Sequence, residues 1–414
     1  MSVGLPSRAI CPVSPLGSGK GSGCAIIEGV WRRLTALDWI RIGLLGLGLV
    51  FVATGALPFT DAVENLSEIG PLLVFLTGVI VLAELTKEAQ VFDALAARMA
   101  VLGRGSYAAL FLLCTLFASL VTIFLNLDTT AVLLTPVMLA LALRTGIAAL
   151  PLAMTTIWLA NTASLLLPVS NLTNLLARNS LQLGNREFAA LMWAPQLAAV
   201  AATMALLWWF FWRRRRRGEP RYTPPVLEPV ADRALFSAAS VACALFIGML
   251  LLDVPVWAAA TAASVLVAGA FAVRARERLT WSLIPWRLLV FVTGLFLVVP
   301  TLSRYGLADA MRWLLGEDDP YRAAAVGAGL SNAINNLPAY TALEEVAGRD
   351  ELPAVLIGTN VGSVITPWAS LATLLWFESC RRHGVKVPMG RFIGTGACLA
   401  VLALLGSVWA LTAV

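Results

Sequence analysis

Long apolar runs recur along the chain at a spacing that suits a lipid bilayer. Runs of about 17–25 apolar residues are long enough to cross the hydrocarbon core as helices. Two further apolar stretches, 105–144 and 321–348, carry polar residues in their middle and predict hairpins that enter and leave the membrane on one side. The remaining runs predict full spans near 41–57, 70–87, 149–178, 189–212, 235–251, 256–273, 286–303, 352–379 and 390–412.

Uncharged polar residues interrupt one of these spans. The stretch ANTASLLLPVSNLTNLL at 160–176 combines Asn, Ser and Thr with a proline and no charge. Irregular backbone at membrane depth is tolerated only where protein or a water-filled cavity surrounds it, and a break exposes the charged ends of two half-helix dipoles. The pattern therefore indicates a helix that unwinds to line a binding site. The alternative is that these side chains only join neighbouring helices by hydrogen bonds.

The same motifs occur twice and in the same order. FLTG at 75–78 corresponds to FVTG at 291–294, and an Asp-Ala pair follows each of them. Further along, NTASLLLPVSNLTNLL at 161–176 aligns with NVGSVITPWASLATLL at 360–375. This order predicts an internal duplication, with a second interrupted span in the second half.

The hairpins also match each other. NLDTTA at 126–131 aligns with NLPAYTA at 336–342, which places Asp128 opposite Pro338. The span at 235–251 has no partner, so it turns the second half over and gives the two repeats opposite topology, as in many secondary transporters. The predicted fold class is an all-α polytopic membrane protein with inverted-topology repeats, two re-entrant hairpins and two broken transmembrane helices.

The predicted organisation has a tail, two repeats and a linker. They are a disordered cytoplasmic tail at 1–36, a first membrane repeat at 37–212 with its hairpin at 105–144 and broken helix at 149–178, a cytoplasmic linker at 213–234, and an extra span plus second inverted repeat at 235–414 with its hairpin at 321–348 and broken helix at 352–379.

Composition and charge support the membrane class. The chain is 59% hydrophobic and 13% charged, whereas soluble domains carry about 25% charged residues, and a β-barrel would show short alternating segments. The net charge is +6. We attribute it to membrane topology and not to a nucleic-acid partner, because Arg213–Arg217 and most other basic residues fall on one side of the membrane. By the positive-inside rule that side is the cytoplasm. We therefore expect a cytoplasmic N-terminus, an outer C-terminus, and the acidic segments 61–68 and 316–319 in outer loops.

No motif predicts an enzyme, a cofactor or a bound metal. The chain has no Gly-rich phosphate loop, no HExxH and no GxSxG. Its cysteines, at 11, 24, 114, 243, 380 and 398, are scattered without a CxxC motif, which argues against disulfides and against a cysteine site for a metal or metalloid. We expect a transporter in the plasma (inner) membrane, surrounded by lipid.

By inverted symmetry, the two hairpin tips and the two helix breaks should meet near the middle of the membrane. A carboxyl at that depth is a functional candidate by default, so Asp128 is the candidate for proton or ion coupling. The alternative is that Asp128 caps the helix beginning at Thr129. No Lys or Arg is predicted at that depth. The predicted substrate-binding residues are Asn126, Thr129, Asn161, Thr162, Ser164, Asn171, Asn335, Asn336, Asn360, Ser363, Thr366 and Ser370.

At these motifs the sequence resembles the arsenical pump membrane proteins, the arsenite and antimonite permeases of the ion transporter superfamily. The resemblance spans about residues 40–412. It differs at the first hairpin tip, where Leu127 separates Asn126 from Asp128. The motifs that carry it are FLNLDTTAVLLTP at 124–136, ANTASLLLPVSNLTNLL at 160–176, SNAINNLP at 331–338 and TPWASLATLLW at 366–376.

The resemblance implies export of trivalent arsenite and antimonite from the cytoplasm by proton antiport with alternating access. It also implies pairing as a homodimer and, in some members, a soluble ATPase subunit. Arsenite near neutral pH is mainly the uncharged trihydroxide, which suits a site of Asn, Ser and Thr side chains. The alternatives are a sodium- or proton-coupled carboxylate or anion transporter or a Na⁺/H⁺ antiporter of the same superfamily, a channel, and a membrane enzyme.

Overall fold

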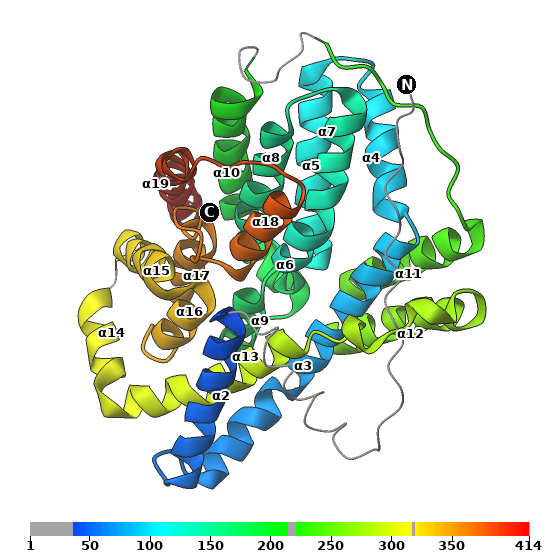
Figure 1. The fold of residues 1–414 in the computed structure, drawn as a ribbon. Coiled ribbons are helices and arrows are strands. Elements are labelled where there is room, and N and C mark those ends of the chain that lie inside the picture. Colours follow the sequence, from blue (N-terminus) through cyan, green and yellow to red (C-terminus); the bar gives the residue numbers. More distant parts are fainter. Residues whose placement is uncertain (1–35, 214–220, 317–318, 414) are drawn as a thin grey trace, which may run out of the picture.

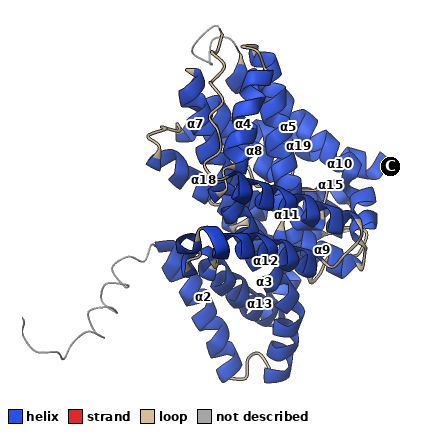
Figure 2. Ribbon diagram, turned by 90° about the vertical axis from the view of Figure 1, so that its right-hand side faces the viewer, coloured by secondary structure: helices blue, strands red, loops and turns tan. Residues whose placement is uncertain are grey.

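The computed structural model describes residues 36–213, 221–316 and 319–413, so the predicted tail at 1–36 lies outside the described residues except for its last position. Within these residues the regular elements are all helices (Figure 2). Eight of the described helices are long and apolar enough to cross a membrane. This agrees with the all-α polytopic class predicted from the apolar runs.

The first half of the chain contains both kinds of interrupted element that the sequence predicts. A single residue separates the two arms of the hairpin, and a nonhelical stretch of backbone separates the two halves of the broken helix. Its elements are α2 (Ala36–Ala53), α3 (Phe59–Glu88), α4 (Val91–Leu102), α5 (Tyr107–Leu125), α6 (Leu127–Thr129) with the π-helical turn η1 (Thr130–Leu134), α7 (Thr135–Thr145), α8 (Ala149–Thr162), the 3-10 turn η2 (Pro168–Ser170), α9 (Leu172–Leu181), and α10 (Asn185–Leu207) with the π-helical turn η3 (Trp208–Trp212).

The second half repeats this order after one additional helix. Its hairpin is α15 and α16, and its broken helix is α17 and α18. The elements are α11 (Arg233–Leu251), α12 (Val256–Arg274), the short turns η4 (Arg276–Arg278) and η5 (Trp281–Leu283), α13 (Trp286–Leu302), the π-helical turn η6 (Ser303–Leu307), α14 (Ala308–Leu315), α15 (Pro320–Ile334), α16 (Asn336–Glu344), α17 (Leu352–Val361), α18 (Leu371–Arg382) and α19 (Met389–Ala413).

One predicted loop is wrong. The acidic segment 61–68 belongs to the first turns of α3, which begins at Phe59 directly after Pro58. A proline before the first turn and an acidic residue within it, here Asp61, both favour the N-terminus of a helix. Part of the other acidic segment, 317–318, lies outside the described residues.

The helices of the two halves pack in exchanged pairs. Helix α2 packs along α13, and α3 packs along α12 (Figure 1). Because the sequence motifs make α3 and α13 equivalent, these two contacts are one contact repeated by the pseudo-two-fold symmetry. Helices α10 and α19 are equivalent and pack against each other, so the pseudo-symmetry axis passes between them. Figure 2 shows α2, α3, α12 and α13 below and α5, α7, α8 and α10 above.

The repeated FLTG and FVTG motifs mark the closest points of these exchanged pairs. A Cβ atom on Gly78 would lie 3.0 Å from the carbonyl carbon of Ala260 in α12. A Cβ atom on Gly294 would lie 2.6 Å from the backbone nitrogen of Leu45 in α2. Backbones approach this closely in membrane helices where small residues stand at the interface, which explains the glycine in both motifs.

The segment between the halves is attached to the first half. The Tyr222 hydroxyl donates to the carbonyl of Ala100 at 2.7 Å, and the Tyr222 ring meets the edge of Tyr107. The backbone N–H of Ala231 donates to the side chain of Gln90 at 2.8 Å. These contacts tie residues 221–231 to the ends of α3 and α4 and the start of α5.

Candidate functional site

The two broken helices meet at Asn360. Its Oδ1 accepts hydrogen bonds from Asn171 at 2.9 Å and from the Thr173 hydroxyl at 2.7 Å. Its amide nitrogen donates to Oδ1 of Asn174 at 2.7 Å. All four side chains are buried, and buried amides need such partners. The breaks of the two halves are therefore joined directly by side-chain hydrogen bonds.

The two breaks are built in the same way. Asn171 caps α9 by accepting from the N–H of Thr173, and Ser370 caps α18 by accepting from the N–H of Thr373. The Ser164 hydroxyl donates to the carbonyl of Asn161 at 2.7 Å. Ser363 repeats that bond to Asn360 at 2.8 Å and also reaches Oδ1 of Asn161 at 3.3 Å.

The two hairpin tips share an unusual backbone conformation. Asn126 has φ 88° and ψ 151°, and Asn335 has φ 133° and ψ 152°. This region is populated almost only by glycine, and a residue held there costs of order 1–3 kcal/mol. Each Asn side chain caps the following helix, Asn126 through the N–H of Asp128 and Asn335 through the N–H of Leu337.

This geometry corrects the predicted register of the tips. Asn126 is equivalent to Asn335, because both have positive φ and both cap the second arm. Asp128 therefore corresponds to Leu337 and not to Pro338. The sequence alignment was shifted by one residue because two asparagines, Asn335 and Asn336, stand next to each other.

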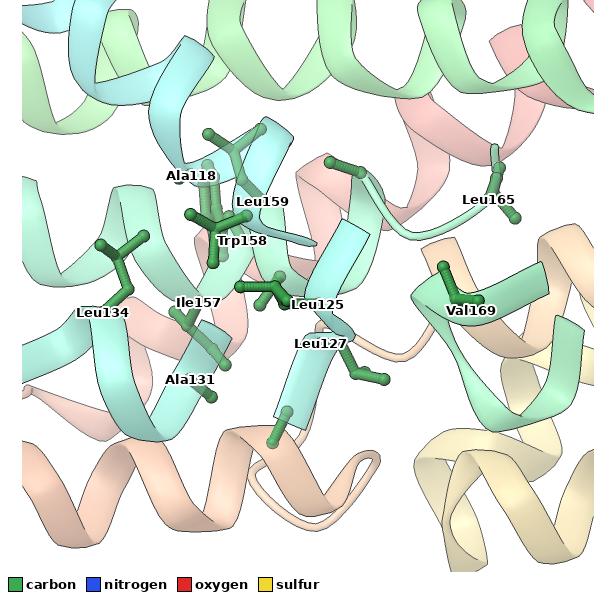
Figure 3. Close-up of a cluster of buried hydrophobic side chains, with 14 of the residues drawn as sticks. Ala118, Leu125, Leu127, Ala131, Leu134, Ile157, Trp158, Leu159, Leu165 and Val169 are labelled. Atoms are coloured by element: carbon green, nitrogen blue, oxygen red, sulfur yellow. The ribbon is translucent and has the colours of Figure 1, made fainter. Parts of the chain in front are cut away.

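Apolar side chains hold the first tip in place. Leu127 and Ala131 follow the tip and pack with Leu125 before it and Ile157 of α8, and Trp158 is fully buried beside them (Figure 3). The hydroxyl of Thr130 accepts from that of Thr122 at 3.1 Å and so connects the two arms. These contacts hold the first tip between α5 and α8.

Asp128 lines a cavity between the first tip and helices α2, α3 and α13. The cavity has a volume of about 180 Å³, and Thr129 also lines it. A neighbouring cavity of about 470 Å³ is lined by Asn335 and Pro338 of the second tip. Leu371, the first residue of α18, lines both, so the positive N-terminal end of α18 lies between the two tips.

A third cavity lies beside these two, at the basic end of α18. It has a volume of about 740 Å³ and is lined by Glu378, Arg381 and Arg382 of α18 and by Lys386. Arg41 lines this cavity and both tip cavities. Arg41 therefore lies where the three cavities adjoin.

Arginine residues do lie near Asp128, contrary to the sequence prediction. Arg41 and Arg287 both line its cavity, and both pair with Asp38, at 2.9 Å and 3.1 Å. The side chains of Asp38 and Arg41 are only 3% and 12% exposed. The hydropathy pattern placed Arg41 and Arg287 at the flanks of their spans, whereas α2 already begins at Ala36 and carries Arg41 into the protein.

The predicted site residues fall into two sets in this structure. Asp128, Thr129 and Asn335 line cavities. The others are engaged in bonds within the protein: Thr162 with Thr203 of α10, Thr366 with Asn332, and Asn336 through its backbone N–H with Ala369. The structure brings the two breaks together at Asn360, as predicted. It places each tip on its own side of the α18 N-terminus.

Sequence reasoning missed two polar residues that support the breaks. Asn332 donates to the carbonyls of Ala328 and Gly362 and accepts from the N–H of Thr366. Gln196 of α10 accepts from the N–H of Leu165 at 2.8 Å. Asn332 lies in the quoted motif SNAINNLP, so its position in an apolar arm was a usable signal. Gln196 stands among apolar neighbours in a long span and gave no such signal.

The described cysteines lie apart from one another, and only one of them lines one of these cavities. Cys114, Cys243 and Cys398 lie in different helices, and Cys380 lines the third cavity. Among residues 36–213, 221–316 and 319–413, no cluster of three His, Cys, Asp or Glu side chains could hold a metal ion. Cys11 and Cys24 lie outside the described residues.

Inverted repeats whose broken helices meet at a buried polar crossing define a polytopic membrane transporter. Residues 30–348 match the citrate transporter family (CitMHS). The arsenical pump membrane protein of Escherichia coli strain K12 is 30% identical over 363 residues, which cover 80% of this chain and 84% of that protein. The chain therefore belongs to the citrate transporter family and to the arsenical pump membrane proteins.

Other relatives agree with this assignment. The arsenical pump membrane protein of Yersinia enterocolitica is also 30% identical, over 80% of this chain and 84% of that protein. A putative arsenical pump membrane protein of Bacillus subtilis strain 168 is 22% identical over 86% of this chain and 90% of that protein. The solved YdaH transporter of Alcanivorax borkumensis has the same fold, with a TM-score of 0.57, 16% identity, and coverage of 91% of this chain and 97% of that one.

Proposed function

We propose that this protein exports arsenite and antimonite, as uncharged trihydroxides, from the cytoplasm in exchange for protons. The carboxylate of Asp128 carries the proposal, because it lies at a hairpin tip and lines a cavity that Arg41 links to the arginine-rich end of α18. A carboxyl in that position can take up a proton on one side and release it on the other. The relatives named as arsenical pumps support the substrate.

The proposed transport cycle moves one part of the protein against the other. The moving part comprises the two hairpins and the two broken helices, and the stationary part comprises the exchanged pairs of α2 with α13 and α3 with α12. The domain division predicted from the repeats, at 37–212 and 235–414, then corresponds to the two duplicated halves. The moving part and the stationary part each contain elements of both halves. The basic end of α18 faces the cytoplasm in this proposal, in line with the positive-inside rule.

Charge balance around Asp128 favours a neutral substrate. Arg41 and Arg287 share Asp38, and Glu84, which also lines the cavity, pairs with Lys87 at 3.4 Å. With Asp128 ionised, these described groups are three positive side chains and three negative ones. A neutral trihydroxide leaves this balance intact, whereas a divalent carboxylate adds charge that the cavity does not offset.

A carboxylate or other anion transporter is the second candidate. The observation that favours it is the pair of arginines, Arg41 and Arg287, beside the cavity of Asp128. Protonation of Asp128 would leave one net positive charge there, which suits a monovalent anion. Dependence of transport on sodium or on an added carboxylate would distinguish this candidate from arsenite–proton exchange.

Everted membrane vesicles from an arsenite-sensitive host test the proposal. We expect the wild-type protein to accumulate arsenite when a proton gradient is imposed, and to stop when a protonophore collapses it. Asp128→Asn should abolish the accumulation, and Asp309→Asn, which neutralises an exposed carboxylate on α14, should not. Correctly inserted protein that takes up a carboxylate and no arsenite would refute the proposed substrate.

A further inference from the structure

Asp128 and Arg41 face one cavity from opposite parts of the protein. Asp128 belongs to the first hairpin tip, and Arg41 belongs to α2, which packs along α13. In the proposed function, on which this inference rests, the tip moves and α2 does not. The cavity between them, about 180 Å³ in volume, is therefore part of the boundary across which the moving part slides.

Charged side chains from three helices of the stationary part line this boundary. The groups that face Asp128 are Arg41 of α2, Glu84 of α3 and Arg287 of α13. Glu84 is balanced by Lys87. The guanidinium groups of Arg41 and Arg287 share the carboxylate of Asp38.

Within the part of the chain that the structure describes, the other elements packed against the tip add no charged side chain to the lining of this cavity. Helix α18 contributes Leu371 and Leu375, and its first charged residue, Glu378, lines the neighbouring cavity and pairs with Arg381 and Arg382. Arg41 and Asp128 thus line this cavity from opposite parts of the protein as groups of opposite charge. The low exposure of Arg41 limits screening by water and salt.

We propose that Arg41 is the positioning residue for Asp128: it holds the moving part in the arrangement seen here, with the tips open toward the basic end of α18, while Asp128 is ionised. Neutralising Asp128 removes the attraction and frees the moving part. Proton uptake and closure toward that face are then coupled through one charge pair. Arg41 contacts neither substrate nor proton in this role, and acts through Asp128.

A cysteine reporter measures this without any arsenite. The variant Leu374→Cys, in a background whose six natural cysteines are replaced by serine, places a thiol on α18 where two of the cavities meet. Its rate of reaction with a charged, membrane-impermeant maleimide in everted vesicles reports how open the cavities are. Glu277→Cys, in an exposed turn between α12 and α13, supplies the reference rate, and the ratio removes the pH dependence that is common to the two thiols.

We expect Arg41→Gln to lower the normalised rate about fivefold or more at neutral pH, the size of an ordinary coupling between two sites. Asp128→Asn should lower it to the same extent, and the double variant should lower it no further. Arg41→Lys should keep most of the wild-type rate, which separates loss of charge from loss of folding. Arg312→Gln, which removes an exposed arginine on α14, is the matched control and should change nothing.

The pH profile gives an independent reading. The normalised rate of the wild-type background should fall as the pH is lowered, and Arg41→Gln should make it independent of pH. An unchanged rate and profile in Arg41→Gln, or effects of Arg41→Gln and Asp128→Asn that multiply in the double variant, would overturn the inference. Because labelling requires no substrate, these outcomes are distinct from a failure of arsenite transport.

Discussion

Gly78 of α3 and Gly294 of α13 occupy equivalent places in the two repeats, and each lets a helix of the other repeat approach its backbone. Gly78 lies against Ala260, and Gly294 lies against Leu45. The two contacts show that the Thr-Gly motif has the same packing function in both repeats, which have opposite orientations in the membrane.

Substitution of Gly294 by alanine should destabilise the protein. The added Cβ would overlap backbone atoms of Leu45, which cannot turn aside, and overpacking of this kind costs about 1–3 kcal/mol. Thermal unfolding in detergent should show a lower midpoint for Gly294→Ala. Gly46→Ala on α2, where a Cβ meets no atom of the described residues within 4 Å, is the control and should be neutral or slightly stabilising. Equal midpoints for the two variants would contradict the packing argument.

The hairpin tips should tolerate glycine better than alanine. Asn126→Gly removes the cap but relieves the strained backbone, whereas Asn126→Ala removes the cap and keeps the strain. We expect the alanine variant to be less stable by about 1 kcal/mol or more, measured as the difference in unfolding free energy in detergent. Asn335 should show the same order, because it has the same conformation. An alanine variant as stable as the glycine variant at both tips would argue against strain.

Asn360 should be one of the most sensitive polar residues in the membrane. Asn360→Ala leaves Asn171, Asn174 and the Thr173 hydroxyl without their partner. Each unsatisfied buried group costs about 1–3 kcal/mol, so a total loss of about 3 kcal/mol or more follows. The measurement is the unfolding midpoint beside that of Asn179→Ala, an exposed asparagine on α9. A loss no larger than in Asn179→Ala would mean that water replaces the bonds.

The start of α11 should depend on pH through Asp232. The hydrogen bond from Arg274 and the backbone N–H groups of Leu235 and Ala234 lower the pKa of Asp232 below its ordinary 3.8. A depressed folded-state pKa contributes stability above the ordinary value and loses it as the pH falls through the lowered one. Asp232→Asn should therefore lower the unfolding midpoint at neutral pH, and the difference from wild type should vanish in strong acid. A difference in unfolding midpoint that stays the same at every pH would mean that the charge of Asp232 does not cause the effect.

Much of the fold was readable from the sequence because the apolar runs and the repeated motifs are long. Both hairpins and both helix breaks lie where the polar residues interrupt those runs. The register of the tips was not readable, because Asn335 and Asn336 are adjacent and only backbone dihedral angles distinguish them.

The candidate site was harder to predict than the fold. Residue type marks Asn161 and Asn171 as polar groups at membrane depth, but it does not say whether they face a cavity or each other. In the structure they face protein. Arg41 was missed because hydropathy assigns a charged residue near the end of an apolar run to the membrane interface. In the structure the ion pair with Asp38 keeps the Arg41 side chain inside the protein.

The exchanged pairing of α2 with α13 and α3 with α12 also constrains how the protein is made. A ribosome completes α3 about 170 residues before it completes the partner face at Ala260, roughly 10–30 s at ordinary elongation rates. During that time the groove at Gly78 has only lipid, or a chaperone of the insertion machinery, against it. Neither repeat can reach its final packing alone, so the nascent first half must wait in the bilayer for the second.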